Sequence, residues 1–375
     1  MPAPGPRPRL TVRIPRPSGG NYPVFVGSGI LRHLPSVLRR FAPAHRYFLI
    51  TDSTVAKLHG RGIHRSMRRS GLRADLLMVP AGERSKTRES KARLEDRMLA
   101  LGGGRDSAIL AIGGGMIGDL AGFTAATYLR GIPFVTVPTT LLAMVDAALG
   151  GKTAVDHPRG KNLIGAFHHP EAVIAEVQVL RTLSEREYRS GLAEVVKTAV
   201  VGDAALFRRL ERSTAAILSR HPEALTEIIT ACCRFKAGVV AADEREAGLR
   251  AILNFGHTLG HALEHLTGYR LAHGEAVAIG MVLEARAAET AGVMRRGETE
   301  RIEALLARLG LPVAIPQRLS AARVLSAARV DKKSRHGTLF YAVPRAVGRV
   351  AGRGGCFTRA LPDRVLESVL ENSTK

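Results

Sequence analysis

The 375-residue sequence contains no tryptophan, only three cysteines and no apolar run of membrane-spanning length. A transmembrane helix needs about 20 consecutive apolar residues, so a membrane protein is excluded. The three thiols, two of them adjacent at Cys232 and Cys233, cannot build the disulfide framework of a small secreted domain. The N-terminal MPAPGPRPR also lacks the apolar core of a signal peptide. Together these absences predict a cytoplasmic protein.

Acidic residues are scarce as well. The chain has 33 of them against 55 lysines and arginines, which gives a formal net charge of +22. A positive field attracts polyanions, but it equally attracts small anionic substrates. The densest basic group has helical spacing and few aromatic neighbours, which indicates a solvated helix face: Arg61, Arg65, Arg68, Arg69 and Arg73. Since no nucleic-acid-binding motif is recognisable, we expect neither a nucleic acid nor a membrane as partner.

Short apolar runs alternate with helical patterns in the first half of the chain. Five runs are predicted to be strands, at residues 47–50, 76–79, 108–112, 134–137 and 172–175. Helical patterns lie between them, notably at 89–101 and 117–128. This alternation predicts a parallel sheet with helices on both faces, which is a Rossmann-like α/β domain over residues 1–183.

The pattern changes after residue 183. Ser184 and Glu187 have the spacing of a capping box at a helix start. From there to about residue 312 nearly every segment has helical period, and one β-like run follows at 339–350. We therefore expect a second, mostly helical domain over residues 184–375, which gives an α/β + α fold.

A glycine-rich turn follows the third predicted strand. Gly113-Gly-Gly115-Met-Ile-Gly118 stands between this strand and a predicted helix, where backbone amides can approach a pyrophosphate. The register differs from the ordinary dinucleotide fingerprint, because no acidic residue ends the next strand. Asp52, at the end of an earlier predicted strand, is the candidate ribose ligand instead. The turn predicts a nucleotide site in a non-standard register.

Several cations lie beside glycines in stretches that we expect to be loops. Lys152 follows Gly150-Gly151, Lys161 follows Gly160, and Lys86 lies near Gly82. Lysine and arginine on such loops suit phosphate and carboxylate groups, although each cation taken alone could serve only solubility.

Three histidines and a glutamate form the most informative group. His257 and His261 are four residues apart, His273 follows in Ala-His-Gly-Glu, and Glu194 lies on a helical pattern with apolar neighbours. A buried glutamate with two histidines is a three-ligand zinc set with an open position. For the two histidines alone, half-buried or solvated rings are the alternative. Other polar residues near this group along the chain are Lys197, Lys236, Glu246, Arg250 and Asn254.

These segments together resemble the 3-dehydroquinate synthases. The motifs on which this resemblance rests include GGGMIGDLAGF, VPTTLL, GGKT, GKNLIG, SGLAE, DERE, LNFGH, HGEAV and DKK at 331–333. The departures are small, and the clearest is Asp156, where the family more often has asparagine. The resemblance implies the α/β + α fold, tightly bound NAD, one divalent metal (zinc or cobalt) and 3-deoxy-D-arabino-heptulosonate 7-phosphate as the anionic substrate. We also expect a homodimer.

The resemblance also implies roles for individual residues. The metal ligands would be Glu194, His257 and His273, while His261 and Glu246 would move protons. Substrate contacts would come from Arg130, Asp146, Lys152, Asn162, Lys197, Lys236, Arg250, Asn254 and one lysine of Lys332-Lys333. NAD contacts would come from Asp52, Glu83, Lys86, Gly114, Gly115, Asp119, Thr139, Thr140, Lys161, Leu180 and Thr182.

The implied activity is a phosphorus–oxygen lyase of the shikimate pathway, the route to aromatic amino acids. One alternative is a related sugar phosphate cyclase of a secondary pathway, such as an aminodehydroquinate synthase. Another is a metal-dependent alcohol dehydrogenase, which would not need so many cations for phosphate and carboxylate groups. The presence of Lys197, Lys236 and Asn254 favours the dehydroquinate reaction.

Overall fold

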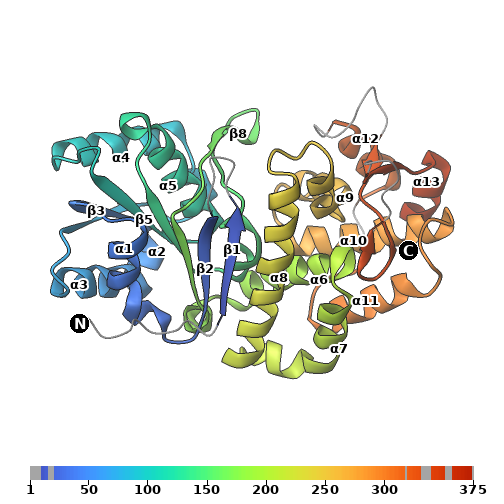
Figure 1. The fold of residues 1–375 in the computed structure, drawn as a ribbon. Helices are drawn as coiled ribbons and strands as arrows, with labels where there is room; N and C mark the ends of the chain where they lie inside the picture. The colour runs from blue at the N-terminus through green and yellow to red at the C-terminus, as the bar shows by residue number, and fades with distance from the viewer. Residues whose placement is uncertain (1–9, 16–20, 317–318, 331–338, 351–356, 374–375) are drawn as a thin grey trace. The chain divides into compact units, whose positions relative to one another are not determined.

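The computed structural model describes residues 10–15, 21–316, 319–330, 339–350 and 357–373 (Figure 1). The chain divides into two compact units. The first contains residues 1–183 and 225–241, and the second contains 184–224 and 242–375. Among the described helices, none has both the length and the apolar character needed to cross a membrane.

A seven-stranded sheet forms the centre of the first unit, in the order β1-β2-β9-β6-β5-β3-β4. Its strands are β1 Leu10–Pro15, β2 Asn21–Gly27, β3 Arg46–Asp52, β4 Ala74–Val79, β5 Ser107–Gly113, β6 Phe134–Pro138 and β9 Ala172–Glu176. Six are parallel, and β1 pairs antiparallel with β2 at the edge. The five predicted strands are confirmed as β3, β4, β5, β6 and β9. The strands β1 and β2 were not predicted.

Helices cover both faces of this sheet (Figure 1). On β3, Phe48 and Ile50 belong to the apolar cluster that includes α4 (Arg88–Ala100) and α5 (Gly115–Thr127). Tyr47 and Leu49 belong to the opposite cluster, with α1 (Leu34–Phe41) and α3 (Arg61–Arg69). Because both faces are buried, the strands read as continuous apolar runs rather than as alternating patterns. Burial of each such side chain stabilises the fold by about 1.5–3 kcal/mol.

The arginine-rich segment corresponds to α3. Ile63 and Met67 are buried under the helix, whereas its arginines are exposed: Arg61, Arg65, Arg68 and Arg69. Arg73 is also exposed, after the helix end. This arrangement agrees with a solvated helix face. A short helix, α2 (Ser53–Val55), and a π-helical segment, η2 (Ala56–Gly60), precede α3.

The expectation that Lys152, Lys161 and Asn162 lie on glycine-rich loops is wrong. They lie on an antiparallel hairpin of β7 (Lys152–His157) and β8 (Gly160–Phe167). Val155 at its centre is fully buried in the α4–α5 cluster, so packing of the hairpin outweighs the local glycine signal. Asp146, also expected in a loop-rich stretch, lies in a π-helical turn, η5 (Ala143–Ala147).

The second unit is mostly helical, as predicted. Its helices are α6 Glu185–Gly202, α7 Ala204–Leu218, α9 His257–Leu266, α10 His273–Thr290, α11 Glu298–Arg308, α12 Ala321–Val330 and α13 Asp363–Asn372. Ser184 caps α6, since its side chain accepts the Glu187 N–H at 3.3 Å. Most of α8 (Pro222–Ala242) belongs to the first unit.

The β-like run at 339–350 is not one strand. It divides into β10 (Phe340–Tyr341), β11 (Pro344–Ala346) and β12 (Arg349–Val350). β11 pairs with β12, whereas β10 pairs with β13 (Arg359–Ala360). The turn at Gly348, with φ of 82°, reverses the chain between β11 and β12, which a continuous strand would not allow.

Two glycines set the distance between α9 and α10. A Cβ atom on Gly280 of α10 would lie 2.0 Å from the carbonyl oxygen of Gly256, just before α9. Gly256 itself has φ of 78°, which side-chain-bearing residues rarely adopt. The two helices therefore pack backbone to backbone at this point. His257 and His273 are the first residues of these helices.

Candidate active site

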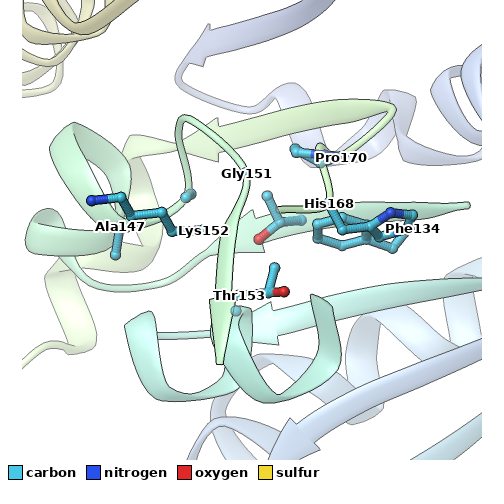
Figure 2. A pocket seen from close by; sticks show the side chains of 10 residues that line it. Phe134, Ala147, Gly151, Lys152, Thr153, His168 and Pro170 are labelled. Carbon is cyan, nitrogen blue, oxygen red and sulfur yellow. The ribbon is translucent and has the colours of Figure 1, made fainter. Parts of the chain in front are cut away.

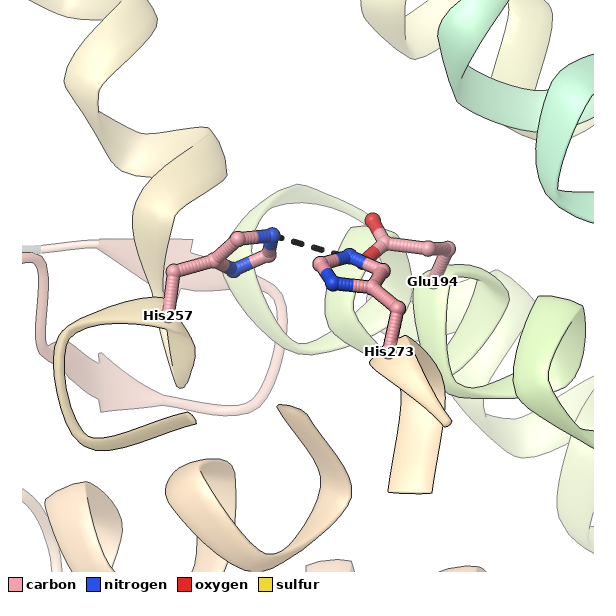
Figure 3. A group of neighbouring side chains, drawn as sticks. All are labelled: Glu194, His257 and His273. Atoms are coloured by element: carbon pink, nitrogen blue, oxygen red, sulfur yellow. Dashed lines mark ion pairs between the residues drawn. The ribbon is translucent and has the colours of Figure 1, made fainter. Parts of the chain in front are cut away.

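Glu194 of α6, His257 of α9 and His273 of α10 come together in the second unit (Figure 3). His257 Nε2 and His273 Nε2 lie 3.5 and 3.4 Å from Glu194 Oε1. Glu194 is 1% exposed, and neither of its carboxylate oxygens has a hydrogen-bond partner among the described residues. A buried carboxylate in this state needs a nearby cation. The three side chains therefore fit a divalent metal ion, with one oxygen and two nitrogen ligands.

The second nitrogen of each histidine ring has its own partner. Nδ1 of His257 lies 3.1 Å from the Phe255 carbonyl oxygen, to which it can donate. Nδ1 of His273 lies 3.4 Å from Glu264 Oε2. Metal-binding histidines usually donate this N–H to a carbonyl or carboxylate, which leaves the Nε2 lone pair for the ion. Both rings therefore present Nε2 on the side of Glu194.

Lys197 supplies a positive charge at this site, since its Nζ forms an ion pair with Glu194 Oε2. Burial raises the pKa of Glu194, but Lys197 and His273 lower it by more than burial raises it, and the resulting pKa is about 2. Burial lowers the pKa of His273, yet the carboxylates of Glu194 and Glu264 raise it to about 10. The Glu194 carboxylate is thus ionised and His273 carries a proton at neutral pH. A metal ion binding to His273 would have to displace this proton.

His261 lies close to both histidines, but its role stays a prediction. Its ring centroid is 5.4 Å from that of His257 and 6.1 Å from that of His273. With Glu264 and His273 it forms a second group that could hold a metal. This group and the Glu194 group share His273, so His273 cannot be a ligand in two separate metal sites at the same time. The resemblance assigns His261 to proton transfer.

A folded loop joins Glu246, Arg250 and Asn254. The Asp243 carboxylate accepts three backbone N–H groups, from Ala247, Gly248 and Arg250, at 2.8–2.9 Å. Asn254 Nδ2 donates to Glu246 Oε1 at 2.7 Å, and Glu246 has φ of 61°. Arg250 is 3% exposed, in the 3₁₀ helix η7 (Leu249–Asn254). Its guanidinium donates to the Glu244 carbonyl. The loop therefore holds these predicted site residues in defined conformations.

In the first unit, the glycine turn has the predicted context of strand, turn and helix. Gly113 ends β5, and Gly114 is the N-cap of α5, where no side chain caps the helix and no acidic residue occupies the first turn. A Cβ atom on Gly114 would lie 3.0 Å from Thr140 Cγ2, and the Thr139 N–H donates to the Gly113 carbonyl at 2.9 Å. The helix N-terminus thus offers amides to an anion such as a pyrophosphate.

Lys86 is buried and is the centre of a cluster of polar side chains. Its Nζ lies 2.6 Å from Asp119 Oδ2, 3.8 Å from Glu83 Oε1, and also donates to Asn162 Oδ1. Burial lowers the pKa of Lys86, but Asp119 and Glu83 raise it above its usual range. Burial raises the pKa of Asp119 to about 6, against the opposing effect of Lys86. Asp156 Oδ1 accepts the Asn162 N–H at 2.8 Å.

Another ion pair joins Lys236 of α8 to Asp146. Lys236 Nζ donates to the Asp146 backbone carbonyl at 2.6 Å and contacts its carboxylate.

A small pocket in the same unit is lined by Lys152, Gly118 of α5, Phe134 and His168 (Figure 2). Lys152 therefore lies beside the last glycine of the predicted nucleotide motif.

The remaining predicted residues are placed as follows. Asp52 is the N-cap of α2, since its Oδ1 accepts the N–H groups of Thr54 and Val55 at 2.8 and 3.0 Å. Thr182 Oγ1 lies 2.8 Å from His59 Nε2. Leu180 is buried in the 3₁₀ helix η6 (Val177–Thr182).

Three further predicted residues lie elsewhere in the first unit. Gly115 begins α5, and Lys161 is exposed on β8. Arg130 is exposed in η4 (Tyr128–Arg130), with φ of 72°. Asp331, Lys332 and Lys333 lie outside the described residues.

Two buried carboxylates of α9 and α10 were not predicted from the sequence. Glu264 lies seven residues after His257, a spacing that places both on one helical face, and this signal could have revealed it. Glu284 of α10 is fully buried and accepts the Gly256 N–H at 2.7 Å. Its only local signal is its position in an otherwise apolar helix segment.

Comparisons with known proteins found similar sequences and similar structures. Family models described as 3-dehydroquinate synthase N-terminal and C-terminal match residues 76–190 and 191–334. A 3-dehydroquinate synthase from Pelobacter propionicus is 48% identical over 329 residues, which is 88% of this chain and 91% of that protein.

Two solved structures have a similar fold. A 2-deoxy-scyllo-inosose synthase, complexed with carbaglucose-6-phosphate, NAD+ and Co2+, has a TM-score of 0.88 at 27% identity. The similarity covers 97% of this chain and all of that one. A 2-epi-5-epi-valiolone synthase from Streptomyces hygroscopicus subsp. jinggangensis, with NAD+ and Zn2+ bound, has a TM-score of 0.84 at 30% identity, over 96% and 98% of the two chains.

Proposed function

Because the chain belongs to the 3-dehydroquinate synthase family, we propose that it converts 3-deoxy-D-arabino-heptulosonate 7-phosphate to 3-dehydroquinate and phosphate. The observation that carries the proposal is the group of Glu194, His257 and His273, which fits one divalent metal. The reaction has no net oxidation. A ring hydroxyl is oxidised, phosphate is eliminated, the ketone is reduced again, and the opened ring closes by an intramolecular aldol reaction.

Two cofactors complete the proposal, NAD and one zinc or cobalt ion. The nicotinamide would accept and return a hydride, and the metal would polarise the substrate alcohol as a Lewis acid. The synthases of similar fold bind NAD+ together with Co2+ or Zn2+. In this chain the open end of α5 suits the pyrophosphate, and the Glu194 group suits the metal.

The metal-site residues have distinct tasks in this proposal. Glu194, His257 and His273 hold the ion, while Lys197 keeps the Glu194 carboxylate ionised. Glu246 accepts a proton, and Asn254 orients its carboxylate through the 2.7 Å hydrogen bond. His261 is the second proton carrier. An acid and a base of this kind are needed because the reaction includes an elimination step and an aldol closure.

Cations and polar groups bind the anionic ends and hydroxyls of the substrate. We assign this task to Arg130, Asp146, Lys152, Asn162, Lys236 and Arg250. A charge-assisted contact of a carboxylate or phosphate with such a cation contributes about 1.5–3 kcal/mol. The NAD contacts that we propose are those predicted from the sequence, with Gly114, Gly115, Thr139 and Thr140 around the pyrophosphate end of α5, and Asp52 at the ribose.

A related cyclase of a secondary pathway is the alternative. The 48% identity to a 3-dehydroquinate synthase over 88% of the chain favours the dehydroquinate reaction. The deciding experiment incubates the purified protein with the heptulosonate phosphate, NAD and zinc, measures released phosphate and identifies the carbocycle. Phosphate release without 3-dehydroquinate would reject this function. Homodimer formation and a cytoplasmic location stay predictions.

NAD should act catalytically and not be consumed. Because the hydride removed in the first step returns in the third, a substoichiometric amount of NAD should support many turnovers. The measurement compares moles of 3-dehydroquinate formed with moles of NAD added, while absorbance at 340 nm monitors NADH. If one mole of NADH accumulated for each mole of product, the protein would be a dehydrogenase.

Lys152→Ala should weaken catalysis more than folding. Lys152 is exposed, so its loss should change the melting temperature little. Loss of one charge-assisted contact should lower kcat/KM by roughly 10- to 150-fold. Steady-state kinetics would measure this, with Lys57→Ala as the control, because Lys57 is an exposed cation of the same unit without an assigned role. Equal kcat/KM values for both variants would remove Lys152 from the site.

A further inference from the structure

One peptide unit connects a buried carboxylate of α10 to His257. The N–H of Gly256 donates to Glu284 Oε2 at 2.7 Å. The carbonyl of the same Phe255–Gly256 peptide lies 3.1 Å from His257 Nδ1 and accepts its hydrogen bond. Glu284 Oε1 also accepts the Leu259 N–H, in the first turn of α9, at 3.2 Å. The peptide is thus held at both ends, by the carboxylate on one side and by the imidazole on the other.

The surroundings leave this peptide little freedom. Glu284 has no exposed surface. Gly256 adopts φ of 78°, and a Cβ atom there would lie 2.5 Å from Met281 Cγ. A carboxylate at a helix N-terminus satisfies amides that have no partner within the helix, and its charge is favoured there. Glu284 therefore caps α9 from a neighbouring helix.

We propose that Glu284 is a positioning residue of the metal centre, which acts on His257 through the Phe255–Gly256 peptide. A carboxylate on the N–H side polarises the peptide and strengthens its carbonyl as an acceptor. This carbonyl then holds the proton on Nδ1 of His257 and leaves the Nε2 lone pair directed toward Glu194. His273 has a direct carboxylate partner in Glu264, and Glu284 serves His257 in the same way across one amide group. The inference rests on the proposed role of His257 as a metal ligand.

Glu284→Gln tests this proposal, because the amide keeps the shape of the side chain but loses its charge. A suitable control is Glu176→Gln in the first unit. Glu176 is also buried, at 3% exposure, and accepts the N–H groups of Gly29 and Leu31 at 2.9 and 3.3 Å. The readouts are the zinc Kd, from competition with a chelator, and the visible absorption spectrum of the cobalt-loaded protein.

We expect Glu284→Gln to weaken zinc binding about 10- to 100-fold, the usual cost of removing a partner of a metal-binding histidine. Its cobalt spectrum should change, whereas Glu176→Gln should match the wild type in both readouts. A purely structural role would lower the melting temperature of both variants and leave the zinc Kd of the folded protein unchanged. That result would overturn the proposal.

A second measurement on the wild-type protein covers the case in which Glu284→Gln does not fold. Zinc should slow hydrogen exchange of the Gly256 and Leu259 amides more than that of the Gly29 and Leu31 amides. Equal effects at both pairs would refute the coupling. If the His257→Ala protein keeps its zinc, the proposed ligand role itself fails. If His257→Ala loses zinc while Glu284→Gln binds it normally, only the positioning role fails.

Discussion

Replacement of His257 with alanine should remove the metal and the activity together. His257 supplies one of the two nitrogen ligands, so its loss leaves only Glu194 and His273 of this group to hold the ion. The loss of a direct ligand should exceed the 10- to 100-fold cost of losing an outer partner, so activity should fall by more than about 100-fold. Elemental analysis after dialysis and a phosphate-release assay would measure the two effects.

His265→Ala is the matched control for this experiment. His265 lies on the same helix, α9, but its side chain is exposed. This variant should keep one metal ion per chain and wild-type activity. If the His257→Ala protein also kept its metal, the alternative group of His261, Glu264 and His273 would become the better candidate for the site.

Lys197→Met should destabilise the metal-free protein strongly. Lys197 and Glu194 are 2% and 1% exposed, and their ion pair is buried. Removal of one partner from a buried pair leaves an uncompensated charge and typically costs about 3–5 kcal/mol in the free energy of unfolding. Zinc should restore much of this loss, because the ion places positive charge beside Glu194 again. Thermal and urea unfolding with and without zinc would measure both effects.

Lys91→Met provides the comparison for Lys197→Met. Lys91 pairs with Glu95 at 2.5 Å within α4, but both side chains are partly exposed. Its loss should cost less than about 1 kcal/mol, and zinc should not change the result. If Lys197→Met melted like the wild type in the absence of metal, the buried pair would not be needed to keep Glu194 ionised.

The parts of the fold that depend on local sequence could be predicted. The buried strands β3, β5 and β6 are continuous apolar runs because both faces of the sheet are covered, and such runs are visible in sequence. The glycine turn before α5 could also be predicted, because a strand, three glycines and a helix follow one another in the chain. β2 was missed, since Asn21–Gly27 includes a proline and has no long apolar run.

The pairing of charged side chains could not be predicted in the same way. The ion pairs of Lys86 with Asp119 and of Lys236 with Asp146 join residues 33 and 90 positions apart. Sequence spacing fixes neighbours only within a helix or a hairpin, so tertiary contacts of this kind leave no local pattern. The i,i+3 pair of Glu194 and Lys197 lies within one helix and was visible for this reason. The partnership of Glu284 with Gly256 spans two helices and was not.

The position of α8 has a consequence for the biosynthesis of the protein. Residues 225–241 belong to the first unit, where Lys236 holds Asp146, although residues 184–224 of the second unit come before them in the chain. During translation, domains generally fold as they emerge from the ribosome, beginning with the N-terminal one. Here the N-terminal unit remains incomplete until the ribosome has passed residue 241. A gene fragment that stops at residue 183 would therefore encode the sheet without one of its own helices.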